Sequence, residues 1–410
     1  MTGSSDRREP PISHLRVPNI SEISFERLRA DRLQRLQQQM HRHGDAVCLL
    51  YKPANIRYAT GTDLMGVWTA GAFARYCIVP AVGAPILFEH RQAIPISQRI
   101  VSDVRPAVVW QFGGYGSEQD ARRFADETYE VLRELSLQDE PLAVDRLDTL
   151  GFLALQDAGI RLRSAGRITT DAREIKTPEE VALLKINGAI GGAIMADFEA
   201  AIRPGIYERD LLAVMCDSLL RHNGDGLVTR LVASGQNTNP WMNEAHDKLV
   251  MPGDLVGVDT DANGYEGYVI DVSRTFLCGS HATAGQREVY ATAHGIVTGM
   301  AELIKPGMTF EDFVHAAPRL PEKFREQRYG SMVHQAGLEM EGPGIPYPED
   351  VAAGRQIPER VIQPNMVLCL ECYAGEVGAP FGVKLEDQVL VTEDGCELLC
   401  TYPYDDKLLA

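Results

Sequence analysis

The stretch V-M-P-G-D-L-V-G-V-D-T-D, residues 250–261, decides the fold because a second stretch of the chain echoes it. Residues 362–371 read I-Q-P-N-M-V-L-C-L-E, where an apolar run again ends on a carboxylate. Asn365 takes the place of the glycine, and asparagine is the next-best residue for a left-handed backbone turn. The echo predicts two related halves that each deliver one carboxylate, Asp259 and Glu371, to a shared site.

A second pair of segments supports this repeat. Residues 202–212 read I-R-P-G-I-Y-E-R-D-L-L, and residues 304–314 read I-K-P-G-M-T-F-E-D-F-V. Each segment follows a long helical stretch, and each has a glycine where a helix ends in a left-handed turn. Two matching pairs in the same order predict a pseudo-twofold arrangement in the second half of the chain.

Six residues of the metal-ligand type lie in and around this repeat. They are Asp259, Asp261, Asp271, His334, Glu371 and Glu386. Carboxylates with one imidazole suit iron, manganese, zinc or cobalt better than calcium or magnesium. The set is larger than one ion usually takes from a protein. It therefore predicts two divalent transition-metal ions that share bridging carboxylates, a geometry that activates water or stabilises a developing anion.

The rest of the chain is long enough for a second domain of ordinary size. Hydrophobic spacing predicts helices over 25–43 and 118–136, and strands over 48–51, 74–80 and 106–110. These elements predict an N-terminal α/β domain over 21–170, after an extended or disordered lead-in over 1–20. T-P-E-E at 177–180 opens a helix that runs to about 201, within a catalytic domain over 171–410.

Charge and cysteine usage limit the possible partners. The net charge of -17 argues against a nucleic-acid partner, because phosphate binding needs clustered Lys and Arg. No apolar run approaches the roughly 18 residues that a membrane helix needs. The eight scattered cysteines indicate buried thiols in a reducing, cytoplasmic protein. Cys369 and Cys372 fit one strand, on which Cys369 shares a face with Glu371 and Cys372 points to the other face.

Five segments together carry a family resemblance. They are N-I-R-Y-A-T-G at 55–61, R-E-I-K-T-P-E-E at 173–180, P-G-D-L-V-G-V-D at 252–259, D-V-S-R-T-F at 271–276 and K-L-E-D-Q-V at 384–389. The chain resembles the pita-bread metalloenzymes: methionine aminopeptidase, aminopeptidase P, prolidase and creatinase. The resemblance implies an α+β protein with the pita-bread (creatinase/aminopeptidase) fold and a pseudo-twofold catalytic domain. A smaller α/β creatinase-type N-terminal domain would precede it.

The resemblance also implies roles for the six ligands. Asp271 and Glu386 would bridge two metal ions, and His334 and Glu371 would bind one of them. Asp259 or Asp261 would bind the other, but neither has the family's spacing to Asp271, so both stay open. Related enzymes form homodimers in which one subunit's N-terminal domain closes the active site of the other.

Two positions depart from the peptidases of this family. Asn243 and Glu341 stand near the places where these peptidases carry two further histidines. Those histidines hold the scissile carbonyl and its tetrahedral anion, and losing such donors costs orders of magnitude in rate. The departures therefore disfavour plain dipeptidase or aminopeptidase activity.

The same departures resemble the metal-dependent dimethylsulfoniopropionate lyases. The D-T-D motif, T-N-P-W at 238–241, Tyr329, T-Y-P-Y-D at 401–405 and V-W-T-A-G-A-F-A-R at 67–75 are similar to segments of those enzymes. The resemblance implies C–S β-elimination from a small zwitterion, giving dimethyl sulfide and acrylate. However, Met340 occupies the position of the lyase base. An Xaa-Pro aminopeptidase or prolidase activity and a creatinase-like C–N hydrolase activity remain as alternatives.

The substrate pocket would use aromatic and charged side chains around the ligands. Aromatic faces stabilise an onium group by roughly 1–2 kcal/mol each when desolvated. The residues expected to contact the substrate are Trp68, Trp241, Phe73 and Arg75. Catalytic roles are expected for Tyr329, for Glu341 or Glu371 as a proton shuttle in a hydrolase, and for Asp261.

Two other classes of protein fit less well. Phosphatases of the haloacid dehalogenase type also carry a D-x-D after an apolar run, but early in the chain. Here the D-T-D lies inside an internal repeat. Pita-bread proteins that only bind partners have lost metal ligands, whereas this chain keeps all six. The sequence therefore favours a metalloenzyme that acts on a small molecule.

Overall fold

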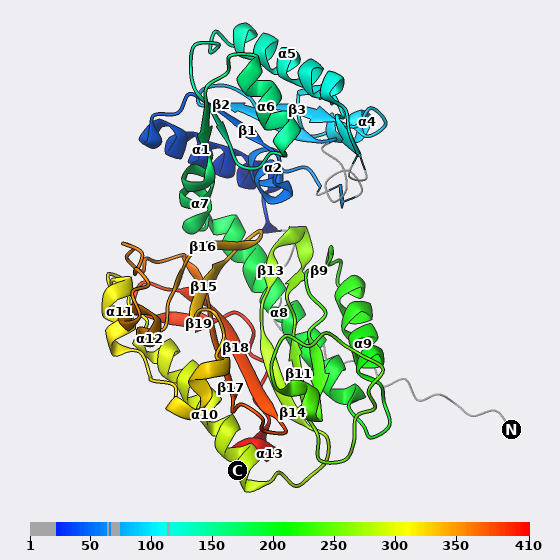
Figure 1. The fold of residues 1–410 in the computed structure, drawn as a ribbon, viewed down its shortest axis with the longest axis vertical. Helices are drawn as coiled ribbons and strands as arrows, with labels where there is room; N and C mark the ends of the chain where they lie inside the picture. The colour runs from blue at the N-terminus through cyan, green and yellow to red at the C-terminus, as the bar shows by residue number, and fades with distance from the viewer. Residues whose placement is uncertain (1–21, 64, 67–73, 113–114) are drawn as a thin grey trace, which may run out of the picture. The chain divides into compact units, whose positions relative to one another are not determined.

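A computed structural model describes residues 22–63, 65–66, 74–112 and 115–410. The predictions for residues 1–20, Trp68 and Phe73 lie outside these described ranges. The chain divides into two compact units, residues 24–179 and 180–410 (Figure 1). The first unit extends beyond residue 170, the limit expected from the sequence, because it includes helix α7 (Gly166–Glu174).

The unit of residues 24–179 is built on a mixed six-stranded sheet with the order β4-β3-β2-β1-β7-β8. Its strands are β1 (Val47–Leu50), β2 (Tyr76–Pro80), β3 (Ile86–Glu89), β4 (Asp103–Pro106), β7 (Leu142–Val144) and β8 (Leu162–Ser164). Its other helices are α1 (Phe25–His43), α2 (Pro53–Thr60), α4 (Ile94–Ser97), α5 (Glu118–Glu134) and α6 (Thr149–Asp157). Two short strands, β5 (Gln111–Phe112) and β6 (Tyr115–Gly116), pair with each other in an antiparallel ladder. Between these layers the rings of Trp110 and Phe124 stack in the core, with centroids 4.2 Å apart.

The predicted helix over 25–43 is confirmed, and local signals explain both of its ends. Ser24 caps the first turn by accepting a hydrogen bond from the backbone N–H of Arg27, and Gly44 ends the helix at a φ of 71°. The predicted strand over 106–110 is wrong, because β4 ends at Pro106. Trp110 instead turns into the core and donates its indole N–H to Asp148 at 2.8 Å.

The unit of residues 180–410 contains, in its described part, an eight-stranded sheet with the order β10-β11-β14-β18-β17-β15-β16, and β19 pairs with β18. Its strands are β10 (Val232–Ser234), β11 (Leu255–Asp259), β14 (Ser273–Leu277), β15 (Val333–Ala336), β16 (Met340–Ile345), β17 (Val367–Gly375), β18 (Gly382–Val391) and β19 (Cys396–Leu398). A small second sheet joins β9 (Gly226–Leu227), β12 (Ala262–Asn263) and β13 (Val269–Ile270). The longer helices are α8 (Pro178–Ala201), α9 (Glu208–Arg221) and α10 (Ala284–Leu303), followed by α11 (Phe310–Ala316), α12 (Pro348–Ala352) and α13 (Asp406–Leu409).

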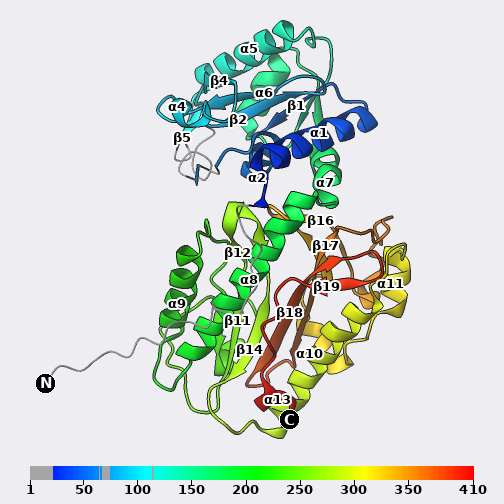
Figure 2. The same cartoon turned by 180° about the vertical axis from the view of Figure 1, so that it is seen from behind.

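The internal repeat is visible in this unit. Helices α8 and α9 precede the hairpin of β11 and β14, and helices α10 and α11 precede the hairpin of β17 and β18. Figure 2 shows α8 and α10 on the same side of the sheet. The predicted left-handed turns are confirmed at Gly205 and Gly307, with φ of 83° and 89°, and at Gly253 and Asn365, with φ of 88° and 67°. Equivalent backbone positions therefore fold alike in the two halves.

Helix α8 differs from one expectation. It is the one helix in the described ranges that is long and apolar enough to cross a membrane by length and composition, with a mean hydropathy of 1.4 over an 18-residue window. Of that window, 67% is buried inside the structure. A mostly buried apolar helix is typical of a protein core.

Candidate metal centre

One row of residues across the sheet places three of the predicted ligands together. Asp259 on β11 pairs with Ser273 on β14, Ser273 pairs with Glu386 on β18, and Glu386 pairs with Glu371 on β17. Directly opposed residues on neighbouring strands project from the same face of a sheet. We call these four residues the ligand row. The repeat predicted that Asp259 and Glu371 converge, and the register confirms it.

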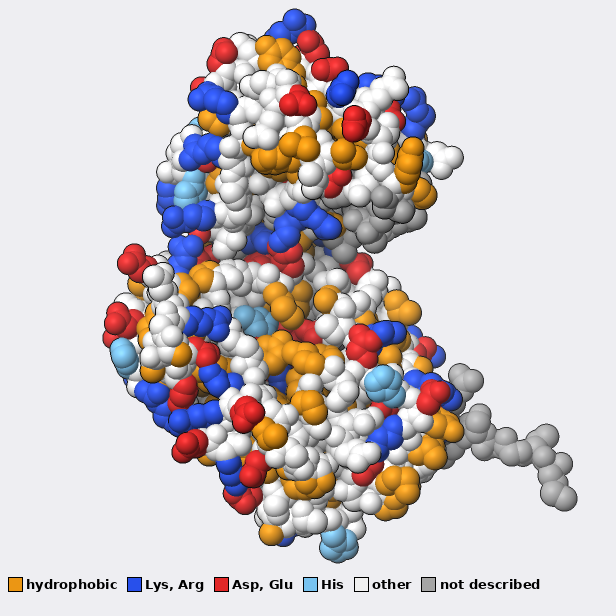
Figure 3. All heavy atoms as spheres, viewed as in Figure 1, with side chains coloured by type: hydrophobic (Ala, Val, Ile, Leu, Met, Phe, Trp, Pro, Cys, Tyr) orange, Lys and Arg blue, Asp and Glu red, His pale blue; other side chains and the backbone are white. Residues whose placement is uncertain are grey.

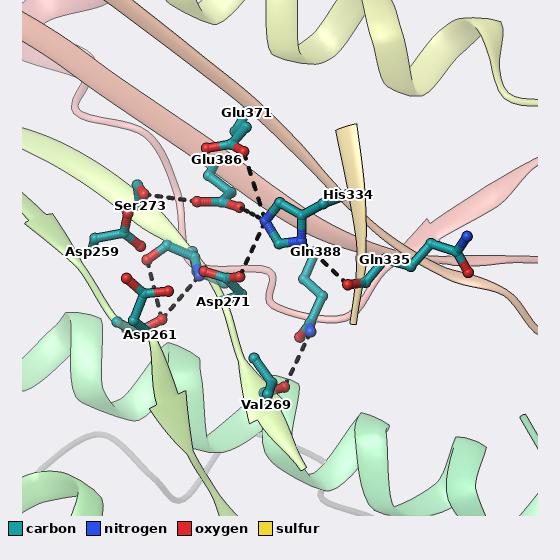
Figure 4. A network of polar contacts seen from close by, with 12 residues as sticks. Asp259, Asp261, Val269, Asp271, Ser273, His334, Gln335, Glu371, Glu386 and Gln388 are labelled. Carbon is teal, nitrogen blue, oxygen red and sulfur yellow. Dashed lines mark hydrogen bonds and ion pairs between the residues drawn. The ribbon is translucent and has the colours of Figure 1, made fainter. Parts of the chain in front are cut away.

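His334 joins the centre from the neighbouring row. His334 on β15 pairs with Cys369 on β17, and Cys369 pairs with Gln388 on β18. We call these three residues the thiol row. The Nε2 atom of His334 lies 3.4 Å from Asp271 and from Glu386, and 3.7 Å from Glu371 (Figure 4). Nδ1 lies 3.3 Å from the carbonyl oxygen of Gln335, which would hold its proton there and leave Nε2 free to bind a cation.

The D-T-D motif brings two aspartates, not one, to the centre. Donor atoms of Asp259, Asp261 and Asp271 lie within 4.8 Å of one another. Thr260 is fully buried between them, and its hydroxyl donates to the carbonyl of Ile270 and accepts the N–H of Val272, both at 2.9 Å. This clamp fixes Asp259 and Asp261 against Asp271. Both aspartates that the sequence left open are therefore in reach.

Asp261 has an uncommon backbone conformation. Its φ of 32° lies in the left-handed region, which aspartate tolerates better than most residues. Its carboxylate accepts a hydrogen bond from the hydroxyl of Thr229 at 2.6 Å, and the residue is only 5% exposed. Strained backbone of this kind persists where the surroundings hold it, which is common at functional sites.

The electrostatics of the centre are those of crowded, buried acids. Burial raises the pKa of Asp259 to about 7 and that of Glu371 to about 8, and the Lys384 ammonium partly opposes both shifts. Burial and the neighbouring Glu386 raise the pKa of Asp271 well above its usual range. For Glu386, burial acts in the same direction, but Lys384 and His334 outweigh it and lower the pKa to about 2. The site therefore holds too little positive charge to keep all of its buried carboxylates ionised.

Orphaned oxygen atoms test whether a cation fits. Within the described ranges, the buried oxygens without a hydrogen-bond partner include Asp259 Oδ1, both Oδ atoms of Asp271, Glu371 Oε1 and Glu386 Oε1. Burying a carboxylate oxygen without a partner is costly, so such atoms call for a ligand. Divalent transition metals accept this mixture of carboxylate oxygen and imidazole nitrogen. The donor set therefore fits the metal ions predicted from the sequence.

Sequence reasoning missed Lys384, which lies on β18 two residues before Glu386 and whose ammonium reaches the carboxylates of the ligand row. Its ammonium is 2.7 Å from Glu386, 2.9 Å from Glu371 and 3.3 Å from Asp259, and the residue is 1% exposed. It also donates to the hydroxyl of Ser273 at 3.1 Å. The sequence pattern that could have revealed Lys384 is K-L-E at 384–386, because alternation along a strand puts Lys384 and Glu386 on the same face of β18.

Trp241, predicted to contact the substrate, and Tyr329, predicted to be catalytic, lie in one aromatic cluster. Trp241 and Tyr373 are buried with Leu231 and Ala233, and the ring of Tyr329 packs against them. The Lys384 ammonium lies 5.0 Å from the centre of the Tyr329 ring, so the cluster borders the metal ligands. Figure 3 shows hydrophobic side chains gathered over the middle of this unit's face.

Glu341 is not brought to the ligands. It pairs across strands with Gln335, whose side chain points away from the metal-ligand cluster in Figure 4. Its carboxylate turns back onto the adjoining loop and accepts the backbone N–H of Leu338 at 3.0 Å. The predicted role of Glu341 as a proton shuttle is therefore not supported by its position. Met340, at the lyase-base position, is 46% exposed.

Asn243 and Arg75 are both engaged locally. The Asn243 amide donates to the carbonyls of Asn237 and Pro240, at 2.8 and 3.0 Å, within its own loop. The Arg75 guanidinium is buried in the first unit, 2.8 Å from Glu89, and donates to the carbonyl of Asp63 at 2.7 Å. Its contact with substrate stays a prediction.

The comparisons with known proteins agree with this geometry. Residues 182–393 match Metallopeptidase family M24, and residues 32–174 match the Creatinase/Prolidase N-terminal domain. The chain is 33% identical to dimethylsulfoniopropionate lyase DddP of Roseovarius nubinhibens, over 94% of this chain and 88% of the relative. It is 27% identical to an Xaa-Pro dipeptidase of Pyrococcus furiosus, over 90% of this chain and 97% of the relative.

Solved structures extend the likeness to the fold. An Xaa-Pro dipeptidase from Bacillus anthracis has a TM-score of 0.75 at 20% identity and covers 92% of this chain and 98% of its own. A prolidase from Thermococcus sibiricus has a TM-score of 0.76 at 21% identity, covering 93% and 98%. These likenesses confirm the predicted architecture, a pita-bread catalytic unit preceded by a creatinase-type N-terminal unit.

Proposed function

Because the chain belongs to metallopeptidase family M24 and is a metal-dependent lyase or hydrolase, we propose that it is a lyase for a small sulfonium zwitterion. The proposed reaction is β-elimination from dimethylsulfoniopropionate. The proton next to the carboxylate is removed, its electron pair forms the C=C bond of acrylate, and the C–S pair leaves with dimethyl sulfide. The named activity of the Roseovarius relative supports this choice.

The observation that carries the proposal is the surroundings of the ligands. All six ligand residues are present, but neither Asn243 nor Glu341 offers the imidazole of the peptidases. Asn243 is held by carbonyls of its own loop, and Glu341 folds onto the backbone of its own strand connection. Both placements argue that no side chain takes over the carbonyl-holding role at those two positions.

The proposed cofactors are two divalent transition-metal ions: iron, manganese, zinc or cobalt. His334 and Glu371 would hold one ion, Asp259 and Asp261 the other, and Asp271 and Glu386 would be shared. When bound, the ions supply Lewis acidity that stabilises the enolate-like charge of the elimination.

The chain's own side chains would bind and orient the substrate. The aromatic cluster of Trp241 and Tyr329 offers ring faces to the sulfonium cation, worth roughly 1–2 kcal/mol each when desolvated. Burial raises the pKa of Tyr329 above its ordinary value, and Glu371 adds to the shift, so its hydroxyl keeps its proton. A protonated phenol can donate a hydrogen bond to the substrate carboxylate. Met340 has no proton acceptor, so the base is another group.

An Xaa-Pro dipeptidase activity is the second candidate. The whole-length likeness to the Pyrococcus enzyme favours it, and the same six ligands serve a hydrolase equally well. A creatinase-like C–N hydrolase remains the third candidate. The predicted homodimer and the cytoplasmic location are also proposals. The eight cysteines lie in the described ranges and are free, which supports a reducing compartment.

The test supplies metal-loaded protein with dimethylsulfoniopropionate and measures dimethyl sulfide in the headspace. We expect dimethyl sulfide and acrylate in equal amounts. The matched control is D271A, which removes a shared ligand but leaves the aromatic cluster intact. If dimethyl sulfide does not exceed the buffer background, the lyase activity is rejected. Release of proline from Gly-Pro would then favour the dipeptidase activity.

A further inference from the structure

A cysteine lies among the ligand atoms of the proposed metal centre. Cys369 is completely buried in the thiol row, directly across from His334 on the neighbouring strand. Its Sγ atom belongs to a group, with donor atoms of Asp271, His334 and Glu386, whose members all lie within 4.8 Å of one another. Ligand atoms around one metal ion have separations of this order, because each bond is about 2.0–2.3 Å long.

Orphaned carboxylate oxygens point to a ligand at this place independently of the cysteine. Neither oxygen of Asp271 makes a hydrogen bond among the described residues, and Glu386 Oε1 makes none; Asp271 Oδ2 and Glu386 Oε1 each face His334 Nε2 at 3.4 Å, where a shared cation would satisfy all three atoms. Both residues are 1% exposed, so water does not satisfy these atoms from the surface. In Figure 4 the two carboxylates and His334 point toward one another.

Cys372 shows what an ordinary buried cysteine on the same strand looks like. It is also completely buried on β17, but it follows Glu371 and projects from the opposite face. Within the part of the chain that the structure describes, it belongs to no group of potential metal ligands. The position of Cys369 is therefore not a general property of cysteines in this strand.

We propose that Cys369 is a metal ligand of the centre, a soft sulfur donor beside His334 Nε2 and the oxygens of Asp271 and Glu386. This inference rests on the proposed metal centre. A thiolate among nitrogen and oxygen donors favours zinc, cobalt or ferrous iron, whereas manganese prefers an all-oxygen or oxygen-rich set. Binding releases the thiol proton to solvent as the metal–sulfur bond forms. The thiol row would thus select the metal at the position held by His334.

Cobalt(II) titration of the full-length chain tests this ligand directly. We expect a near-ultraviolet sulfur-to-cobalt charge-transfer band in the unmodified protein and in the matched control C372S. In C369S we expect this band to vanish while the visible cobalt bands remain. The affinity for zinc and cobalt should fall roughly tenfold or more in C369S, and the affinity for manganese should change much less.

X-ray absorption of the unmodified, zinc-loaded chain decides the matter even if C369S does not fold. A sulfur neighbour at about 2.3 Å supports the proposal. The thiol ligand is overturned if the visible cobalt bands appear without a sulfur charge-transfer band, or if that band persists in C369S. Either result is still compatible with the proposed metal centre. Absence of all cobalt bands from the unmodified chain would instead overturn the metal centre itself.

Discussion

The β11–β14 hairpin and the β17–β18 hairpin occupy equivalent places in the repeat, and they meet where Ser273 pairs with Glu386. The first hairpin supplies only oxygen donors, from Asp259, Asp261 and Asp271. The second supplies Glu371 and Glu386 together with an ammonium and a thiol. The repeat thus fixes where side chains arrive, and each half then fills those places with its own chemistry.

The largest effect is expected from the residue that both halves share. D271A removes a carboxylate that lies near His334 and near Asp259 and Asp261, so neither metal position keeps its ligand set. We expect loss of nearly all bound metal and activity, measured by elemental analysis and by the headspace assay. D247A removes an aspartate whose side chain is 77% exposed, and it should keep both. Full metal content in D271A would contradict a shared site.

Lys384 gives the β17–β18 hairpin a buried positive charge, and the substitution K384M removes this difference between the two hairpins. Removing one partner of a buried ion pair typically costs 3–5 kcal/mol, because the remaining charge stays buried. In K384M the carboxylates of Asp259, Glu371 and Glu386 lose their ammonium partner and depend on bound metal for positive charge. We expect a large fall in the Tm of metal-free protein and a smaller fall after metal is added. K384R, which keeps the charge, is the matched control; equal falls with and without metal would contradict this role.

The acids of the two halves should make metal-free protein sensitive to pH. In the folded chain the pKa of Asp259 is about 7 and that of Glu371 about 8, above their ordinary values of 3.8 and 4.5. At intermediate pH the folded state therefore binds more protons than the unfolded state, and stability falls as pH rises. We expect the free energy of unfolding to decrease from about pH 5 to pH 8, by up to about 1.4 kcal/mol per pH unit for each acid.

Urea unfolding at several pH values measures this slope. Metal replaces the protons on these acids, so the metal-loaded protein should lose most of the slope. Glu386 acts in the opposite sense, because its pKa of about 2 stabilises the fold above pH 4.5 and that contribution is lost toward pH 2. A stability that rises between pH 5 and 8 without metal would contradict the assignment of raised pKa values.

The sequence was sufficient for features that depend on local signals. The turn at Asn365 and the apolar runs that end on Asp259 and Glu371 need only nearby residues, and all of them are found as predicted. Lys384 and Cys369 could not be placed with the same ease. Their partners come from other strands, and the register between strands is set by tertiary pairing.

Glu341 lies next to an irregular strand pairing, which prevents its facing direction from being predicted by alternation along the sequence. The register between β15 and β16 shifts between Val333 and Gln335, so residues after His334 no longer follow a simple alternation. Glu341 consequently lies opposite Gln335 rather than on the face of His334. A β-bulge leaves little trace in the sequence, so the pairing of Glu341 with Gln335 could not be predicted from the sequence.

The smallest effect is expected at Thr260, whose hydrogen bonds stabilise only the β11–β14 hairpin and its connection. T260V keeps the shape of the side chain but removes the hydroxyl that bonds to Ile270 and Val272. Leaving buried backbone groups unsatisfied costs about 1–3 kcal/mol. Metal affinity should fall at the position of Asp259 and Asp261, with less change at that of His334. T128V, whose buried hydroxyl donates to a helix carbonyl in the other unit, is the matched control for stability. Equal loss of both metals in T260V would show that the two halves do not hold their ions separately.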